Sequence, residues 1–358
     1  MSTEARNESY WDDLVEEHGR STSRLSESDR ATSKNNPEQP SPWEVRNQPL
    51  TERDGIALRQ EVRDLDNLEG DRPLSWREST KEWREYIIDS EDTEAIFQNG
   101  ETGQYHAGGD PHRFDPEYND KQYAKLKDLQ RGLSEDYGRR LHTAMLSCTA
   151  SWCPEGEPLP PVDHLNELDS SWEAVRRALS RVLEGRRWEY LAILEPHKSG
   201  YLHIHIAVFV EGKVTQETFD PVIQAHLRNC DLAGPEAHDV TDDSTISVRH
   251  AGADRDLDDD DQLDELAIYL AEYLGTYGDD DPLEAPDHVQ MSNTVLWATG
   301  KQRWRPSNGA QQYMKAYPKE DDESDWELIG IRSGTEYYPC EDASGGVDRF
   351  VTSSLDPP

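Results

Sequence analysis

The sequence has few basic and few apolar residues for its length. Among 358 residues there are 37 Lys or Arg against 74 Asp or Glu, which gives a formal net charge of −37. Only 34% of the residues are hydrophobic, so the whole chain cannot belong to a packed core. A chain of this length has room for about two domains.

Three further features are missing, and each absence excludes a class of protein. No apolar run approaches the ~20 residues that span a bilayer, so we expect no membrane protein. The N-terminal sequence is polar and acidic, without the basic region and apolar stretch of a signal peptide. Reduced thiols in the cytoplasm are the simplest interpretation of the few cysteines, and we predict a cytoplasmic protein. These cysteines are scattered without metal-finger spacing: Cys148, Cys153, Cys230 and Cys340.

The acidic excess has two interpretations. A chain that is acidic throughout is typical of a disordered interaction protein. Here the acidic residues run through strongly patterned segments, and 10 Trp and 15 Tyr are available for packing. At about 1 M salt the Debye length falls to ~3 Å, which screens the repulsion among surface carboxylates. We therefore favour a folded protein of an extreme halophile.

Composition divides the chain into four regions. Residues 1–75 lack sustained periodicity and are rich in Ser, Asn, Pro, Glu and Arg, which predicts a disordered acidic and polar arm. Residues 76–118 are predicted to form a helical lead-in and linker. Residues 119–317 are predicted to form the functional domain, and residues 318–358 a polar C-terminal tail with a hairpin near 326–340.

Helical spacing alternates with short apolar strands within the predicted domain. The two central strands are joined by a short hairpin, so this pair must be antiparallel. The order of elements favours an α+β fold, with a sheet flanked by helices, over a parallel doubly wound sheet. We predict helices over 121–137, 164–183, 214–227, 264–277 and 284–298, and strands over 141–150, 188–194, 202–210 and 245–248.

Two histidines lie on the same face of a predicted strand. His203 and His205 are two positions apart, and such side chains share one face of a strand. Glu195 lies just across the turn and reaches that face if it pairs with His203. Imidazole and carboxylate ligands together suit a divalent metal, including Mg²⁺ or Mn²⁺. The alternative is that both imidazoles are merely hydrogen-bonded on a half-buried strand. His197 and Lys198, in the turn, are poorer candidates for ligands.

Two tyrosines are four positions apart on the predicted helix over 264–277. Tyr269 and Tyr273 would therefore lie one turn apart on the same face. One interpretation is that both rings pack beside the leucine stripe of this helix. The other is that a phenol acts as a covalent nucleophile on a phosphate, with a metal ion neutralising the developing charge.

These segments together resemble a known family, the HUH endonucleases, and most closely the rolling-circle replication initiators of plasmids and small single-stranded DNA viruses. The landmarks match in order. First comes the strand Met145-Leu-Ser-Cys-Thr149, and then His203-Ile-His205, with Glu195 eight residues upstream of His203. The Tyr269-Leu-Ala-Glu-Tyr273 helix follows about sixty residues later. The resemblance covers residues 140–280, and the acidic composition is similar to that of a haloarchaeal plasmid or virus member.

The resemblance implies an antiparallel sheet of about five strands, with the metal site on the sheet and the tyrosine helix above it. Glu195, His203 and His205 would bind Mg²⁺ or Mn²⁺. Tyr269 would attack single-stranded or hairpin origin DNA, giving a 5′-phosphotyrosine and a free 3′-OH that primes synthesis, and Tyr273 would resolve the displaced strand. No Walker-type phosphate loop is present in the sequence, so a host helicase and polymerase are implied as partners.

The tyrosine segment departs from the family pattern at two positions. Many relatives carry a lysine between or after the tyrosines, where this sequence has Glu272 and Thr276. Glu265, four residues before Tyr269, matches a glutamate that some single-tyrosine relatives carry. The division of labour between Tyr269 and Tyr273 therefore stays open.

A short basic segment near residue 300 is the best candidate for contacts with DNA. Phosphate contacts weaken steeply with salt, so an acidic protein at high salt depends on local contacts. Arginine forks suit phosphates and base edges, and tryptophan faces stack on bases. The alternative is a packed flap whose basic side chains pair with acidic residues. The candidates are Lys301, Arg303, Trp304 and Arg305.

Other functions are also compatible with the sequence. A two-tyrosine HUH transposase would use the same chemistry to insert DNA. A metal-dependent regulator would bind DNA without cutting it, and a metal hydrolase would turn over substrate without a covalent adduct.

Overall fold

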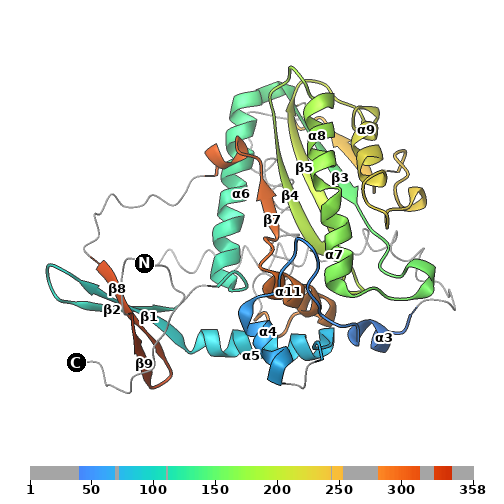
Figure 1. Cartoon of the computed structure of the whole chain (residues 1–358). Helices are drawn as coiled ribbons and strands as arrows, with labels where there is room; N and C mark the ends of the chain where they lie inside the picture. The colour runs from blue at the N-terminus through green and yellow to red at the C-terminus, as the bar shows by residue number, and fades with distance from the viewer. Residues whose placement is uncertain are drawn as a thin grey trace.

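The structure is a computed structural model that describes residues 40–68, 72–109, 112–242, 244–252, 281–314 and 326–340. Within these residues the strands form two antiparallel sheets, one of five strands and one of four (Figure 1). Helices lie on both faces of the five-stranded sheet. The fold is therefore α+β, as the sequence predicts.

The five-stranded sheet has the two histidines on its central strand. Its strand order is β6-β3-β5-β4-β7, and every neighbouring pair is antiparallel. The prediction of an antiparallel sheet of about five strands is confirmed. The strands are β3 (Leu141–Cys148), β4 (Trp188–Pro196), β5 (Leu202–Glu211), β6 (Ile246–Arg249) and β7 (Trp304–Pro306).

Successive side chains of each strand point to opposite faces of this sheet, so part of the core lies on each face. On β5, Phe209 packs in a cluster with helix α6 (Pro116–Tyr137), whereas Val208 packs in the larger cluster on the opposite face. Odd-numbered residues of β5 therefore face α6, and His203 and His205 share that side. The helices on the opposite face are α7 (Pro161–Ser170), α8 (Trp172–Val182) and α9 (Gln216–Leu227).

The single helix predicted over 164–183 is wrong, because α7 and α8 are separate helices that meet at Ser171. The Ser171 hydroxyl oxygen lies 3.1 Å from the Leu168 carbonyl oxygen and 2.7 Å from Nδ1 of His226 in α9. Serine that bonds its own backbone competes with helix continuation. The apolar spacing runs on through this point, so periodicity alone does not reveal the break.

Four helices gather at one end of the five-stranded sheet (Figure 1). They are α3 (Pro42–Arg46), α4 (Gln60–Leu68), α5 (Trp76–Glu91) and α11 (Asp287–Thr299). The Trp76 indole N–H donates to the Met291 carbonyl at 2.8 Å, which joins α5 to α11. Leu50 and Val62 are fully buried in the same core. The predicted disordered arm over 1–75 is therefore corrected for residues 40–68, whose few apolar side chains are buried.

The smaller sheet joins two distant parts of the chain. Its order is β2-β1-β8-β9, all antiparallel. The C-terminal hairpin predicted near 326–340 is confirmed, but it pairs through β8 with a strand from the predicted linker, which the sequence does not reveal. The strands are β1 (Thr93–Asn99), β2 (Tyr105–Gly109), β8 (Trp326–Ser333) and β9 (Glu336–Pro339).

Two sequence predictions lie outside the described residues. One is the helix over 264–277, which contains Tyr269 and Tyr273, and the other is the arm over 1–39. The boundaries of the four predicted regions stay predictions. Within the described ranges, no helix is both long enough and apolar enough to span a bilayer.

Candidate metal centre

The register of the β4–β5 hairpin brings Glu195 to the histidines. Glu195 pairs directly with His203, and Ile193 pairs with His205. Paired residues of an antiparallel sheet lie on the same face, so all three polar side chains point to the α6 side. The prediction that Glu195 reaches the face of the two histidines depended on its pairing with His203, and the structure has this pairing.

A tight turn fixes that register. The His197 amide donates to the Tyr201 carbonyl at 2.7 Å, and the Gly200 amide donates to the His197 carbonyl at 2.8 Å. Gly200 has a φ of +91°, which L side chains rarely adopt, and a Cβ there would lie 3.2 Å from Met291 and Trp76. Glycine is therefore needed for both the conformation and the close packing of the turn.

Three ligand-type atoms converge at the end of this hairpin. Oε2 of Glu195 lies 2.6 Å from Nε2 of His205 and 3.2 Å from Nε2 of His203. The two Nε2 atoms are 2.8 Å apart. With their ligand atoms within 4.8 Å of one another, one carboxylate and two imidazoles form a candidate site for a metal ion.

The protonation states of the cluster also suit a cation. Burial opposes ionisation of Glu195, but the adjacent His203 and His205 favour the carboxylate and lower its pKa to about 2. Burial lowers the pKa of His205, which keeps that imidazole neutral near pH 7. A carboxylate and a neutral imidazole are the forms that bind metals.

The remaining polar atoms of the site fit a metal centre better than a closed hydrogen-bond network. Nδ1 of His203 and Oε2 of Glu195 are buried without a well-aligned hydrogen-bond partner. Such groups are costly to bury unless something compensates them, and a cation does so for the carboxylate. Nδ1 of His205 lies 3.1 Å from the Ser147 hydroxyl, which orients the ring from β3.

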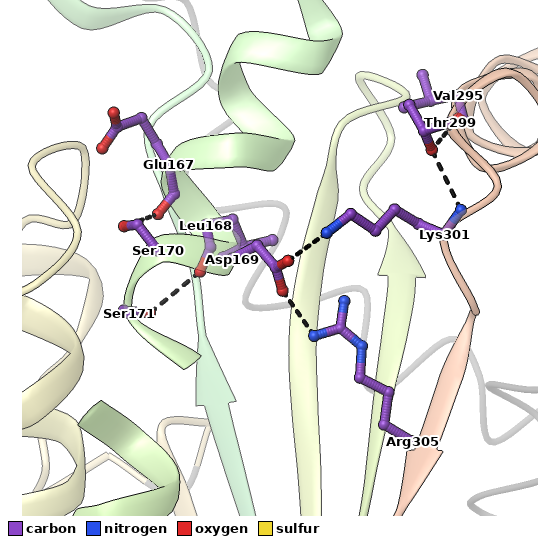
Figure 2. Close-up of polar contacts among 9 residues, drawn as sticks. All are labelled: Glu167, Leu168, Asp169, Ser170, Ser171, Val295, Thr299, Lys301 and Arg305. Carbon is purple, nitrogen blue, oxygen red and sulfur yellow. Dashed lines mark hydrogen bonds and ion pairs between the residues drawn. The ribbon is translucent and has the colours of Figure 1, made fainter. Parts of the chain in front are cut away.

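Two of the four predicted DNA-binding residues lie in an ion-pair network (Figure 2). Nζ of Lys301 is 2.6 Å from Oδ2 of Asp169, and Nη1 of Arg305 is 2.6 Å from Oδ1 of the same carboxylate. Arg305 also lies over the Trp172 ring at 5.8 Å. The two ion pairs of Asp169 connect the end of α7 to β7 and to the loop before it. This arrangement matches the alternative interpretation of the sequence, a packed flap whose basic side chains pair with acidic residues.

The other two candidates lie on the α6 side of the sheet. Trp304 pairs with Ile193 across β7 and β4 and packs against the α6 cluster. The Arg303 guanidinium donates to Oδ1 of Asn293 in α11. DNA binding by Lys301, Arg303, Trp304 and Arg305 stays a prediction, with the four side chains divided between two environments.

The chain matches the family model described as "Putative rep protein (DUF1424)" over residues 47–340. It belongs to this family. The match includes the Glu195–His203–His205 cluster, both sheets and the helices on the sheet faces.

Two proteins from Halobacterium are similar to this chain over most of their length. An "Uncharacterized 36 kDa protein" of Halobacterium salinarum is 45% identical over 292 residues, which is 79% of this chain and 90% of that protein. A protein of the same name from Halobacterium sp. (strain GN101) is 42% identical over 293 residues, 77% of this chain and 87% of that protein. No solved structure matches the chain significantly.

Sequence reasoning missed two residues that contact the predicted site residues. Ser147 lay in the strand that carried the family resemblance, but only its pairing with His205 shows that it touches the imidazole. Asp169 is one of many acidic residues, and nothing in its local sequence marks it as the partner of Lys301 and Arg305. The tyrosines cannot be placed against the cluster, because they lie outside the described residues.

Proposed function

We propose that the protein initiates replication by nicking and rejoining one strand of origin DNA. The observation that carries this proposal is the Glu195–His203–His205 cluster in a chain whose family is described as a Rep family. The cluster supplies a site for a divalent cation, and the family suggests a DNA substrate. The organism of the two relatives and the acidic composition support a haloarchaeal plasmid or virus as the source.

Each residue of the proposed site has a distinct task. A bound Mg²⁺ or Mn²⁺ would act as a Lewis acid on the scissile phosphate. Glu195 would provide the negative charge that holds the cation, and His203 and His205 would provide nitrogen ligands. Ser147 orients the His205 ring.

The nucleophile of the proposed reaction is Tyr269. Its phenolic oxygen forms the bond to phosphorus as the bond from phosphorus to the 3′ oxygen breaks, which leaves a 5′-phosphotyrosine and a free 3′-OH. The phosphotyrosine conserves the energy of the phosphodiester, so no nucleotide cofactor is consumed. Tyr273 repeats the transfer to release the displaced strand after one round.

The proposal also defines the partners and the cellular location. The substrate is single-stranded or hairpin origin DNA, and extension of the 3′-OH needs a host polymerase and helicase. We place this reaction in the cytoplasm, where the plasmid or viral genome is copied.

Adduct formation tests the proposed chemistry. Protein is incubated with single-stranded origin oligonucleotides and Mn²⁺ in high salt, and is then resolved on a denaturing gel. We expect a covalent adduct that is absent from the Tyr269→Phe, Tyr273→Phe double variant and from His203→Ala. A metal-dependent DNA regulator would bind the oligonucleotide without any adduct, and a hydrolase would cut it without becoming attached. Either result contradicts the proposal.

A further inference from the structure

Basic side chains gather at the end of the five-stranded sheet that lies opposite the candidate metal centre. There β3 begins at Leu141, which pairs with Glu211 at the end of β5, and β4 begins at Trp188, which pairs with Val210. The segments that flank these strand ends therefore come together. They carry a group of Lys and Arg residues that form the distal patch: Arg139, Arg140, Arg186, Arg187 and Lys213.

Two stacked imidazoles hold the backbone of the patch in place. The rings of His142 in β3 and His250, directly after β6, have centroids 4.0 Å apart and planes inclined by 12°. Nδ1 of His142 lies 3.1 Å from the Arg140 carbonyl oxygen, and Nε2 of His250 lies 2.9 Å from the Arg139 carbonyl oxygen. The two arginines that precede β3 are therefore fixed against the end of β6.

Positive charges converge on His142. Burial lowers the pKa of this imidazole, and the charges of His250, Arg186 and Lys213 lower it further, although a hydrogen bond to a backbone carbonyl opposes the shift. The Arg186 guanidinium also donates through Nη1 to the Lys213 carbonyl at 2.6 Å, which joins the loop before β4 to the turn after β5. Like charges are therefore brought together here from separate segments of the chain.

The carboxylates beside the distal patch neutralise only part of it. Glu211 pairs with Arg140, and its Oε2 lies 3.9 Å from Nη1 of Arg187. Arg187 also pairs with Asp136 at 2.8 Å. Because the chain has 74 acidic against 37 basic residues, cations left without a carboxylate in one place point to an external anion. The remaining residues of the patch are exposed and form no ion pair with any residue of the described ranges: Arg139, Arg186 and Lys213.

Duplex DNA is the anion whose charge density fits the patch best. Its two strands together carry one negative charge per ~1.7 Å of helix axis, against one per ~3.4 Å for each strand. Guanidinium and ammonium groups are the usual donors to phosphate oxygens. Single-strand sites combine charge with aromatic rings on which the bases stack, whereas this patch consists of charged groups alone.

The distal patch lies far from the candidate metal centre. His142 pairs with Val210, and β5 continues from there for five residues to His205. This separation is ~17 Å at the usual rise of a strand. It corresponds to about five base pairs of duplex. A DNA molecule that occupies both places must therefore continue for at least that length beyond the metal centre.

We propose that the distal patch binds the phosphate backbone of duplex DNA, and that it holds the double-stranded arm of a hairpin origin while the strand to be cut lies at the metal centre. This inference rests on the proposed function for the identity of the partner. Phosphate contacts carry no sequence information, so the patch positions the duplex and does not select its sequence.

The salt dependence of duplex binding tests the inference. Binding of a labelled duplex of about 20 base pairs, which exceeds the separation given above, is measured by fluorescence anisotropy with EDTA at several KCl concentrations. The logarithm of the affinity falls with the logarithm of the salt concentration by ~0.9 for each phosphate contact. The Arg186→Gln, Lys213→Gln variant should therefore show a slope shallower than wild type by about 2, and weaker binding at the lowest salt concentration.

A second double variant provides the charge-matched control. Arg176 and Arg177 belong to α8 and pair with Glu173, outside the distal patch. The Arg176→Gln, Arg177→Gln variant should keep the wild-type slope, and equal melting temperatures of the two double variants would establish that both are folded. Because Arg186→Gln also removes the bond to the Lys213 carbonyl, Lys213→Gln alone is measured too and should lower the slope by about 1.

The outcomes separate this inference from the proposed function. A wild-type slope in Lys213→Gln and in the patch double variant overturns the distal patch, as does an equal loss in the control, which would reflect net charge alone. A single-stranded oligonucleotide of the same length whose slope falls as much as that of the duplex overturns the choice of duplex. None of these results affects the metal-dependent adduct. A patch-dependent slope in a protein that never forms an adduct would overturn the nicking proposal and retain the distal patch.

Discussion

Glu195 shows at the scale of single residues why the cluster is more than a pair of packed histidines. Its Oε2 lies within 3.2 Å of two imidazole nitrogens, yet it has no well-aligned hydrogen bond. A buried carboxylate without a compensating positive charge is unfavourable. A divalent cation among the three ligand atoms would remove this cost, and the Ser147 contact holds one ring in position for it.

Ser147 should tune metal affinity without being a ligand. We expect Ser147→Ala to weaken Mn²⁺ binding by about tenfold, because groups that orient metal-ligating histidines typically contribute 10- to 100-fold. Isothermal titration calorimetry in high salt measures the affinity. His106→Ala, on the exposed strand β2, is the control and should bind Mn²⁺ as wild type does. Unchanged affinity in Ser147→Ala would remove Ser147 from the site.

His226 should make folding sensitive to mild acid. Burial lowers its pKa to about 4, and its nitrogens lie 2.7 Å from the Thr149 carbonyl oxygen and 2.7 Å from the Ser171 hydroxyl. In the unfolded chain the pKa returns to ~6.5, so the unfolded state binds more protons between these values. Stability should therefore fall as the pH falls from about 6.5 to 4, by up to about 3 kcal/mol for this residue, and be unaffected above 6.5.

Urea unfolding at several pH values measures this dependence. The His226→Gln variant should show a shallower loss of stability between pH 6.5 and 4 than wild type, whereas the exposed His106→Gln control should follow wild type. Parallel curves for His226→Gln and wild type would contradict the assignment of a neutral buried imidazole.

At the scale of elements, the β4–β5 hairpin shows how much of the structure could be predicted from the sequence. Its two strands, its antiparallel pairing and the shared face of His203 and His205 follow from alternation and a short turn, whereas the position of Glu195 depends on a register that the structure supplies. Pairing between strands that are distant in the sequence cannot be predicted in this way, because no local feature of β1 identifies β8 as its partner. The break at Ser171 and the Asp169 pairs depend on neighbours distant in sequence, so periodicity could not predict them. Residues 40–68 looked disordered because their few apolar side chains are widely spaced.

Asp169 should stabilise the attachment of β7 to α7. Asp169→Asn leaves Lys301 and Arg305 with a neutral partner, and losing one member of a mostly buried ion-pair network costs roughly 3 kcal/mol. Guanidinium chloride would screen the effect, so urea unfolding is the measurement. Glu173→Gln removes a more exposed pair with Arg176 and should cost well under 1 kcal/mol. Equal effects of the two substitutions would contradict a structural role for the Asp169 network.

Charge dominates the behaviour of the whole molecule. A formal net charge of −37 repels itself over a Debye length of ~10 Å at 0.1 M salt but only ~3 Å at 1 M. We therefore expect the melting temperature, followed by circular dichroism, to rise steeply between these two KCl concentrations. An equal melting temperature at both would contradict the interpretation of the acidic surface as an adaptation to high salt.

The location of the covalent bond tests the central claim most directly. An adduct formed with origin DNA and Mn²⁺ is digested with nuclease and trypsin, and the nucleotide-bearing peptide is identified by mass spectrometry. Trypsin cleaves after Arg255 and after Lys301, and residues 256–300 contain no Lys or Arg, so one peptide contains both Tyr269 and Tyr273. The account predicts a nucleotide on one of these two tyrosines, and none when Glu195, His203 and His205 are replaced by Ala. A nucleotide on a tyrosine outside this peptide, or an adduct that persists without the three ligands, would contradict it.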